Sequence, residues 1–219
     1  MAIRMSDGLK NALLDTGPAK TLFTKGFMEL YSGSQPSSGN ADESGFTRRM
    51  IMGNRLTVAQ NGLAFGTIET FTLDGDQEAL FEAEDNIFCI HGTTVIEAEV
   101  VSADFDSVDT TTVTVTSASD LTDALSEVVL GVNWAAAAAG AELPKLETEI
   151  WQGKGLSDGS VGWWRLYSND LDRGADSEGD KVRLDGNIGS SGDIQAVSTT
   201  IQTNAVSTLD NFKLKFPTT

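Results

Sequence analysis

Three kinds of feature are scarce in this chain of 219 residues, and each scarcity excludes a class of structure. There is one cysteine, Cys89, which rules out an internal disulfide, and there is one histidine, His91. Because a zinc site usually takes three or four ligands rich in these two residue types, no zinc centre is expected. The longest run of small apolar residues, 134–139, is far shorter than the roughly 20 residues of a membrane-spanning helix.

Basic residues are also few: 15 lysines and arginines face 32 acidic residues, which gives a formal net charge of −17. Phosphate backbones and anionic lipid headgroups repel such a chain, so neither nucleic acid nor a membrane surface is expected as a partner. The first ten residues lack the apolar segment of a secretory signal. Together with the single cysteine, this predicts synthesis in a reducing cytoplasm.

Prolines number only four, against 22 glycines, and threonine and valine are common. This balance predicts a β-rich fold with tight turns. The clearest strand pattern lies in the segment GWWRLYS, where Trp163, Arg165 and Tyr167 point one way and Trp164 and Leu166 the other. Because large rings fall on both faces, we expect this strand to be covered on both sides, by a second sheet or by a neighbouring subunit.

Further strands are predicted wherever apolar residues alternate between turn signals. Outside the middle of the chain these segments are 27–32, 46–52, 55–59, 63–67, 181–184, 194–201 and 211–216. Asn61-Gly62 is a strong signal for a two-residue hairpin, and Phe212, Leu214 and Phe216 are expected to face inward. The pattern predicts a mainly β fold, with a β-sandwich or jelly-roll-like domain.

The N-terminus predicts a short helix over residues 1–14, capped by Ser6 or Asp7 and ended by Gly17. A helix of this length is not stable alone, so it must dock on other structure. Two alternatives remain open for residues 1–25: docking on their own sheet, or serving as an arm that docks on a neighbouring subunit.

The middle of the chain, residues 74–140, is acidic and reads as an inserted α+β subdomain, which leaves 1–73 and 141–219 as the main domain. Its predicted strands are 79–83, 87–91, 95–102 and 110–116. A helix is predicted to start at Ser119 or Asp120, with Leu121, Leu125 and Val128 among the apolar residues of one face. The run 135–139 continues that helix or forms a spacer.

Two groups of residues carry possible chemistry. Cys89 and His91 lie two positions apart, on one face of a predicted strand, as a nucleophile pair could; the alternative is a buried small side chain and an ordinary histidine at a strand end. The acidic loop after the Trp strand offers oxygen ligands for calcium, but its spacing does not fit an EF-hand, and a solvated turn is the alternative. Its acidic residues are Asp170, Asp172, Asp176, Glu178 and Asp180. We predict no catalytic residue, metal or cofactor.

The aromatic residues of the Trp strand could stack on sugars or bases, but packing in a core or an interface is the favoured interpretation. The residues predicted to form an interface are Arg4, Leu9, Leu13, Trp151, Trp163, Trp164 and Tyr167.

Two stretches stand out by the order and spacing of their motifs. The first is MAIRMSDGLKNALLD, continued by FMELYSGSQPSS and NGLAFGT; the second is WQGKGLSDGSVGWWRLYSND, with VRLDGNIGSSGDI and the closing NFKLKF. In these stretches, which cover most of residues 1–67 and 151–216, the chain resembles a largely uncharacterised group of structural proteins from the particles of tailed phages and prophages. Members of that group are shorter, so residues 74–140 inherit nothing from the resemblance.

The resemblance implies a non-enzymatic component of the virion, assembled in the host cytoplasm. We expect a capsid decoration or cement protein on the outer surface of the head, where it stabilises the shell, with the inserted subdomain projecting outward. Its partners would be the major capsid protein or other virion proteins, and further copies of itself in a homo-oligomer such as a trimer. One alternative is a tail, neck or fibre protein that touches host glycans through the insertion or the Trp strand. Another is a Cys/His hydrolase or a carbohydrate-active β-sandwich enzyme.

Overall fold

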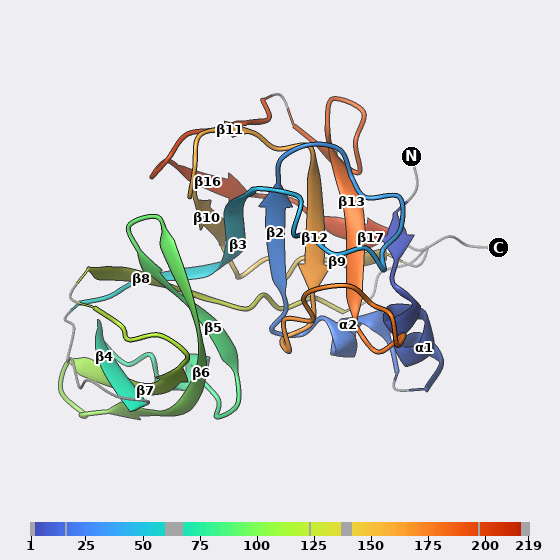
Figure 1. Ribbon diagram of the computed structural model, residues 1–219. Coiled ribbons are helices and arrows are strands. Elements are labelled where there is room, and N and C mark those ends of the chain that lie inside the picture. The colour runs from blue at the N-terminus through green and yellow to red at the C-terminus, as the bar shows by residue number, and fades with distance from the viewer. Residues whose placement is uncertain are drawn as a thin grey trace. The chain divides into compact units, whose positions relative to one another are not determined.

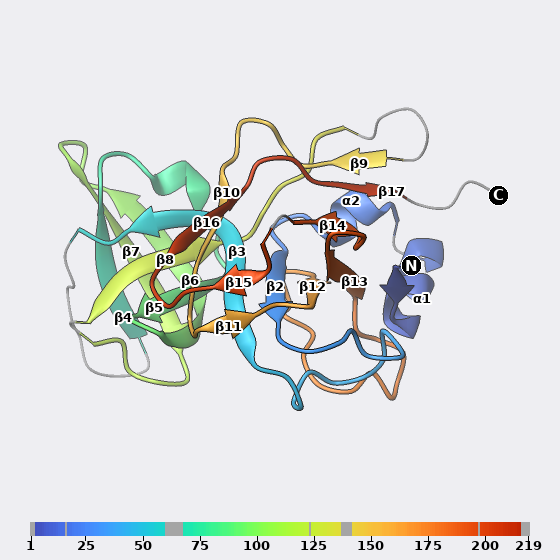
Figure 2. The ribbon, with the colours of Figure 1, turned by 90° about the horizontal axis from the view of Figure 1, so that it is seen from above.

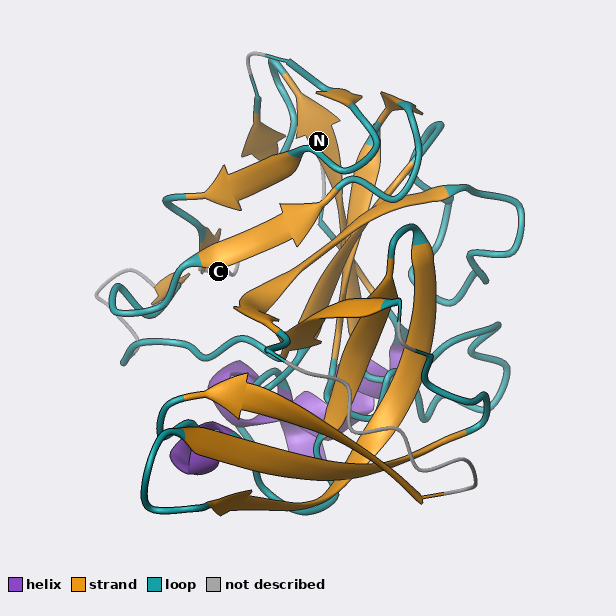
Figure 3. Ribbon diagram, turned by 90° about the vertical axis from the view of Figure 1, so that its left-hand side faces the viewer, coloured by secondary structure: helices purple, strands orange, loops and turns teal. Residues whose placement is uncertain are grey.

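The computed structural model describes residues 3–15, 17–59, 68–122, 124–136, 142–196 and 198–215. The chain divides into two compact units. The main unit comprises Met1–Asn54 and Gly131–Thr219, and the inserted unit comprises Arg55–Leu130. Strands make up most of the regular structure in both units, so the predicted mainly β fold is confirmed (Figures 1 and 3).

The elements of the main unit are short strands and two helices. They are β1 (Arg4–Met5), α1 (Asp7–Asp15), α2 (Ala19–Leu22), β2 (Phe27–Tyr31), β3 (Arg48–Thr57), β9 (Glu142–Pro144), β10 (Trp151–Lys154), β11 (Gly159–Ser160), β12 (Trp163–Tyr167), β13 (Arg183–Gly189), β14 (Ile194–Gln195), β15 (Thr200–Ile201), β16 (Val206–Leu209) and β17 (Lys213–Lys215). Strand β3 starts in the main unit and ends in the inserted unit.

The centre of the main unit is an antiparallel sheet in the order β1-β13-β12-β2-β3. Strand β12 lies between β13 and β2, and all five of its residues are buried. The predicted strand is therefore confirmed, and it is covered on both faces as expected. One face of β12 carries Trp164 and Leu166, which belong to the apolar core of the unit, and the other carries Trp163, Arg165 and Tyr167.

The apolar face of this sheet is covered by the rest of the main unit. Helices α1 and α2 contribute Leu9, Ala19 and the adjoining Phe23, and β9, β10 and β17 contribute Leu143, Trp151 and Leu214. Strand β10 also pairs with β3, so the sheet curls back over its own apolar face, as in a β-sandwich. Figure 2 shows β9, β17 and α2 on one side of β2, β12 and β13, and two long loops on the opposite side.

Helix α1 begins later than predicted. Ser6 is the cap, since its Oγ accepts a hydrogen bond of 3.1 Å from the backbone N–H of Leu9. The residues before it, Arg4–Met5, form β1 opposite Asp185 and Leu184 of β13, so the prediction that the helix includes them is wrong. Leu9 is fully buried in the core of its own unit, which places the N-terminal segment on its own sheet.

The inserted unit consists of β4 (Ile68–Asp74), the 3-10 helix η1 (Glu78–Leu80), β5 (Asn86–His91), β6 (Thr94–Phe105), β7 (Thr110–Ser117) and β8 (Leu125–Leu130). Its strands follow the antiparallel order β8-β5-β6-β7-β4. The strands close on themselves, because the N–H of Val58 donates to Ser126 on β8 and the N–H of Ala59 donates to Thr72 on β4. A second apolar core, which includes Phe71, fills the interior.

Two predictions inside the insertion are wrong. The predicted helix after Ser119 is the strand β8, whose residues are buried except for the half-buried Ser126. A strand surrounded by other structure loses its period-two alternation, and its apolar residues then imitate a helical pattern. The predicted strand 79–83 starts instead within η1.

Other predicted boundaries shift. Segments 46–52 and 55–59 fall in or beside one continuous strand, β3, and Asp185-Gly186, a dipeptide typical of turns, lies inside β13. Segment 194–201 holds two short strands, β14 and β15. The hairpin signal Asn61-Gly62, the segment 63–67, most of the alanine run and Phe216 lie outside the described residues. The units divide after Asn54 and Leu130, whereas the sequence placed the boundaries at 74 and 140.

The chain leaves the main unit and returns to it at neighbouring positions. Asn54 is the last residue of the first main-unit segment and Gly131 is the first residue of the second. The side-chain Nδ2 of Asn54 donates a hydrogen bond of 3.0 Å to the backbone oxygen of Gly131. The main unit therefore continues across the insertion with its two connection points in direct contact.

Gly186 explains why a turn signal can lie in a central strand. It sits opposite Trp164 on β12, and a Cβ at this position would overlap the indole ring. We expect Gly186→Ala to destabilise the main unit by roughly 1–3 kcal/mol, the usual cost of overpacking a core, as measured by urea unfolding. Gly45→Ala is the matched control, because a Cβ there meets no atom within 4 Å. Equal effects of the two substitutions would contradict the packing described for Trp164.

Candidate functional site

A layer of buried charged and aromatic residues covers the second face of the central sheet. Register places Glu29 of β2, Arg165 of β12 and Asp185 of β13 side by side in one row across three strands. All three side chains are fully buried. This row, with the residues bonded to it, is called the polar layer below. Since charges are almost never fully buried unless they are paired, the partners of the row define the site.

Arg165 is held by the deepest ion pair of the layer. Its Nε and Nη2 donate to the two carboxylate oxygens of Asp185 at 2.6 and 2.8 Å, a bidentate geometry. Burial alone would lower the pKa of Arg165, but the hydrogen bonds and charge of Asp185 outweigh it and raise the pKa. Burial acts the other way on Asp185 and raises the pKa of its carboxyl. We take the pair as ionised because both carboxylate oxygens receive a short hydrogen bond from a guanidinium.

Glu29 occupies a second ionic centre beside the first. Arg48 donates to it at 3.0 Å and Arg173 at 2.9 Å, and Tyr31 also donates to its carboxylate. Burial alone would raise the pKa of Glu29, but the hydrogen bonds and charge of Arg173, together with the charge of Arg48, lower it to about 2. Glu29 therefore stays ionised throughout the physiological range.

Aromatic rings complete the layer. The hydroxyls of Tyr31 and Tyr167 lie 3.0 Å apart, and the ring of Tyr31 stacks on Trp163 with centroids 4.5 Å apart. The guanidinium of Arg165 lies 5.3 Å from the ring of Trp163. Burial, followed by the charge of Glu29, raises the pKa of both tyrosines, which act as neutral hydrogen-bonding groups.

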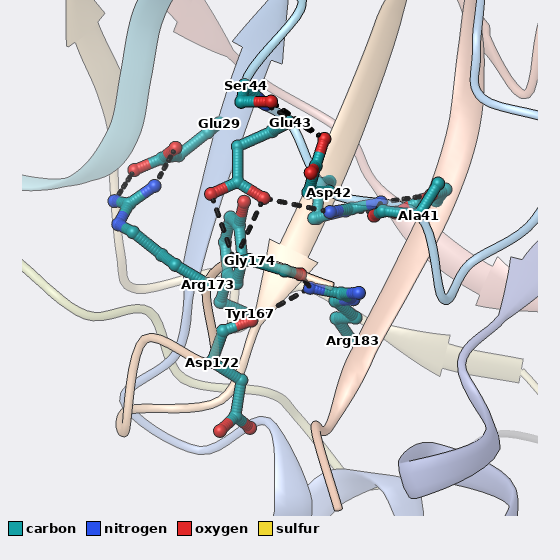
Figure 4. A network of polar contacts seen from close by, with 12 residues as sticks. Glu29, Ala41, Asp42, Glu43, Ser44, Tyr167, Asp172, Arg173, Gly174 and Arg183 are labelled. Atoms are coloured by element: carbon teal, nitrogen blue, oxygen red, sulfur yellow. Dashed lines mark hydrogen bonds and ion pairs between the residues drawn. The ribbon is translucent and has the colours of Figure 1, made fainter. Parts of the chain in front are cut away.

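Two loops, residues 32–47 and 168–182, lie over the polar layer, on the side of the sheet opposite β9 and β17 (Figure 2). Arg165 reaches the first loop, where its Nη2 donates to the backbone oxygen of Ala41 at 2.9 Å and its Nη1 to Glu43 at 3.2 Å. Glu43 in turn accepts from the backbone N–H of Gly174 in the second loop at 3.3 Å (Figure 4). The layer thus ties the two loops to the sheet and to each other.

Arg183 of β13 holds both loops in place through hydrogen bonds to their backbone oxygens. Its guanidinium donates to backbone oxygens: Gly39 and Asn40 in the first loop, at 2.8 Å each, and Asp172 and Gly174 in the second (Figure 4). Burial lowers the pKa of Arg183, and the charge of Arg165 acts in the same direction. A fully buried guanidinium that is used on main-chain carbonyls fixes loop conformation.

The acidic loop uses its carboxylates in the same structural way. Asp176 accepts from the backbone N–H groups of Gly8 and Gly179 at 3.1 and 2.9 Å, and Asp172 accepts from Val182 at 2.7 Å. Asp170, Glu178 and Asp180 are exposed. In the part of the chain that the structure describes, no three His, Cys, Asp or Glu side chains gather in a way that could hold a metal ion.

Most of the residues predicted to form an interface lie inside the chain. Those that are fully buried are Leu9, Trp151, Trp163, Trp164 and Tyr167. Arg4 and Leu13 are half-buried and keep accessible surface. The buried rings pack within their own subunit and are not accessible to a sugar or to a neighbouring chain. Only Arg4 and Leu13 of this set retain surface for the predicted role.

Cys89 and His91 both lie on β5 of the inserted unit. The Cys89 side chain is fully buried in the apolar core, and burial raises the pKa of its thiol to about 12. The Nδ1 atom of His91 lies 2.9 Å from the hydroxyl of Thr122. Since the thiolate is the nucleophilic form, a thiol with this pKa is inert at neutral pH. Burial supports the interpretation of Cys89 as a small core residue.

An open groove of about 590 Å³ lies at the edge of the main core. Its lining includes the apolar Ile194, Leu209 and Phe212 and the basic Lys145 and Lys213. The ring of Phe212 lies 5.6–5.9 Å from three tryptophan rings of the core, so the floor of the groove is the rim of that core.

The polar layer was not recognised from the sequence, although part of its signal is local. Alternation in FMELY already places Glu29 and Tyr31 on one face of a strand, and alternation in GWWRLY places Arg165 beside two rings. The missing information is the strand pairing. It joins residues more than 130 positions apart, such as Glu29 and Arg165, and no local pattern reveals it.

Comparison with known proteins gives no relative. No protein-family model, no curated protein and no solved structure matches the chain. Among the described residues, no helix is both long enough and apolar enough to cross a membrane.

The polar layer predicts a specific acid sensitivity. The folded pKa of Glu29, about 2, lies below its ordinary value of 4.5, so its ionisation stabilises the fold above pH 4.5, and this contribution is lost as the pH falls towards 2. We expect Glu29→Gln to lower the free energy of unfolding at pH 7 by about 3 kcal/mol and to flatten its pH dependence between these values. Chemical unfolding at a series of pH values is the measurement.

Glu178→Gln is the control for this substitution, because it makes the same charge change at an exposed position of the covering loop. It should leave both stability and its pH dependence nearly unchanged. If the two variants had the same acid profile, Glu29 would not be the group whose ionisation stabilises the fold.

Burial of Cys89 predicts that its thiol does not react in the folded protein. We expect a thiol reagent at pH 8 to modify the native chain far more slowly than the unfolded chain, in which one thiol reacts. Thr93→Cys, in the exposed turn between β5 and β6, provides a reactive positive control. Rapid modification of Cys89 in the native chain would reopen the hydrolase alternative.

Proposed function

We propose that this chain is a structural protein of a tailed-phage particle, and specifically a decoration or cement protein on the outer surface of the head. The observation that carries the proposal is the position of the two stretches that resemble virion proteins. More than 80 residues separate the two stretches in the sequence, yet motifs from both form adjacent strands in the main unit: β2 from FMELYS, β12 from GWWRLY and β13 from RLDGNIG. Three of the motifs that carry the resemblance thus lie side by side in one sheet, while the closing NFKLKF forms β17, which pairs with β9 in a separate two-stranded sheet.

The inserted unit also supports the proposal, because it separates the residues with a resemblance from most of those without one. The part of the chain without counterpart in the resembling proteins falls largely in a compact unit of its own, with its own apolar core. Because the main unit meets across the insertion at Asn54 and Gly131, a shorter protein could have the same main unit without it. This is the relationship expected between the chain and the shorter virion proteins that it resembles.

The polar layer suits a part that must hold its shape. Buried, fully bonded ionic networks fix loop conformation, and fixed loops present a constant surface to a partner. A net charge of −17 keeps the chain away from packaged DNA and is compatible with the outer face of a shell, where local complementary patches would bind the major capsid protein.

A position in the tail, neck or fibre is the second candidate within the particle. Its glycan-binding form loses support at the Trp strand, since Trp163 and Trp164 are fully buried. The inserted unit keeps this candidate open, because the resemblance says nothing about that unit.

Copy number in purified particles tests the proposal. We expect quantitative mass spectrometry, normalised to the major capsid protein, to find the chain in gradient-purified particles at hundreds of copies each. A few to a few dozen copies would assign it to the tail or connector instead. A chain found in the lysate of infected cells but not in particles would end the proposal.

The cement role has a separate test. Particles produced without the chain should release their DNA at a lower temperature, and purified chain added back should bind them to saturation and restore the release temperature. Binding without any change in release temperature would indicate decoration without cementing.

A further inference from the structure

Strand β16 (Val206–Leu209) forms an open edge of the main unit. It pairs with β10 on one side, through Trp151 opposite Leu209 and Lys154 opposite Val206. Among the described residues no strand pairs with its other side. The first three residues of β16 are exposed, and Val206 is among the exposed large apolar side chains of the chain, at 47%. An open edge presents unpaired backbone N–H and C=O groups, to which another strand can add.

The edge lies in an unusual part of the sequence. From Ile194 to Leu209 there is no charged residue, in a chain of which 21% is charged and whose net charge is −17. Natural edge strands usually carry lysine, proline or a bulge, which keep other strands away. β17 follows that rule with Lys213 and Lys215, whereas β16, with the sequence VSTL, has none of these protections.

The hydrogen-bond pattern fixes which groups face outward. The N–H of Gly155 donates to the carbonyl of Ala205 at 2.9 Å, immediately before β16. Because bonding residues alternate along an antiparallel pair, Ser207 and Leu209 bond towards β10. The backbone groups of Val206 and Thr208 therefore point away from β10, into the open edge.

We propose that β16 pairs with β16 of a second copy of this chain, antiparallel and about a twofold axis at Ser207. In this register Val206 lies opposite Thr208 of the second copy, and the reverse, so the outward backbone groups of both residues are used. Ser207 lies opposite itself, in the closely spaced, non-hydrogen-bonded position, where its small hydroxymethyl group causes no clash. The strand is thus complementary to itself, as an isologous interface requires.

The lack of charge on β16 is the reason to expect a second copy of this chain at this edge. Two copies with a net charge of −17 repel each other, so contact between them is least unfavourable where neither copy places a charge. β16 offers an uncharged backbone edge, and its antiparallel self-pairing sets no like charges opposite each other. The pairing does not depend on the proposed role in a phage particle, and its test needs only the purified chain.

A single cysteine at the axis tests the geometry. Non-hydrogen-bonded antiparallel partners have Cα atoms about 4.5 Å apart, which is within the range for a disulfide. The native Cys89 is fully buried, so Ser207→Cys introduces the accessible thiol. Under mild oxidation we expect a cross-linked species of twice the chain mass of 23.2 kDa. It should form at least ~10-fold faster than with the exposed control Thr93→Cys, since pairing raises the effective thiol concentration.

A charged substitution at the twofold axis tests the interface without a cross-linking reaction. In light scattering coupled to gel filtration, the native chain should form dimers whose dissociation constant falls several-fold as salt rises from ~0.05 to ~0.5 M, since salt screens the repulsion between copies. Ser207→Asp sets two like charges opposite each other and should give monomers, while Thr93→Asp should dimerise like the native chain.

Three results would overturn the proposal. The first is a native chain that stays monomeric up to ~1 mM, the concentration of very weak association, at every salt concentration. The second is cross-linking of the Ser207→Cys variant no faster than that of the Thr93→Cys variant. The third is a Ser207→Asp variant that dimerises as well as the native chain, which would assign self-association to another surface. Circular dichroism of each variant, matched to the native spectrum, excludes unfolding as the cause of a lost dimer.

Discussion

The bidentate pair between Arg165 and Asp185 is the interaction on which the main unit depends. It lies at the centre of the sheet, with no access to water, and its remaining donors reach the covering loop at Ala41 and Glu43. Buried ion pairs contribute less to stability than their number suggests, because desolvation offsets much of the Coulomb attraction. Their effect here is on geometry: an arginine that donates from all three of its nitrogens, to Asp185 and to the loop, restricts the arrangement of the loop above it. The polar layer therefore determines the shape of one surface of the unit, while the apolar core on the other face supplies most of the hydrophobic stabilisation.

Local patterns predicted those parts of the fold whose two faces differ. Strand β12 was recognised because its rings and its arginine alternate, and Ser6 was among the predicted caps because a hydroxyl before an apolar periodic segment is a local signal. Strand β8 was mistaken for a helix because it is buried on both faces, so its residues give no period of two. The polar layer escaped prediction for a different reason. Each of its charges looks like an ordinary surface residue until strand pairing sets Glu29 and Asp185 on either side of Arg165.

Because both faces of the central sheet are covered within the chain, they determine which residues remain available for contacts with other chains. The large aromatic residues that were predicted to form contacts between subunits, such as Trp163 and Trp164, are buried in the interior of the chain. The chain as a whole is strongly acidic, but the segment 194–209, which ends in β16, has no charged residue. The proposed pairing of β16 uses an uncharged, unpaired backbone edge rather than large apolar side chains. Specific contacts between acidic proteins can be made in this way without reducing the charge that keeps them soluble.

The contact between Asn54 and Gly131 has a consequence for protein engineering. Because the chain departs and re-enters the main unit at two residues joined by a hydrogen bond, the sheet places almost no demand on what lies between them except closely spaced ends. Foreign domains whose own termini are adjacent, such as many enzymes and binding modules, meet that demand. The inserted unit could therefore be replaced by a foreign domain at this position while the main unit keeps its fold.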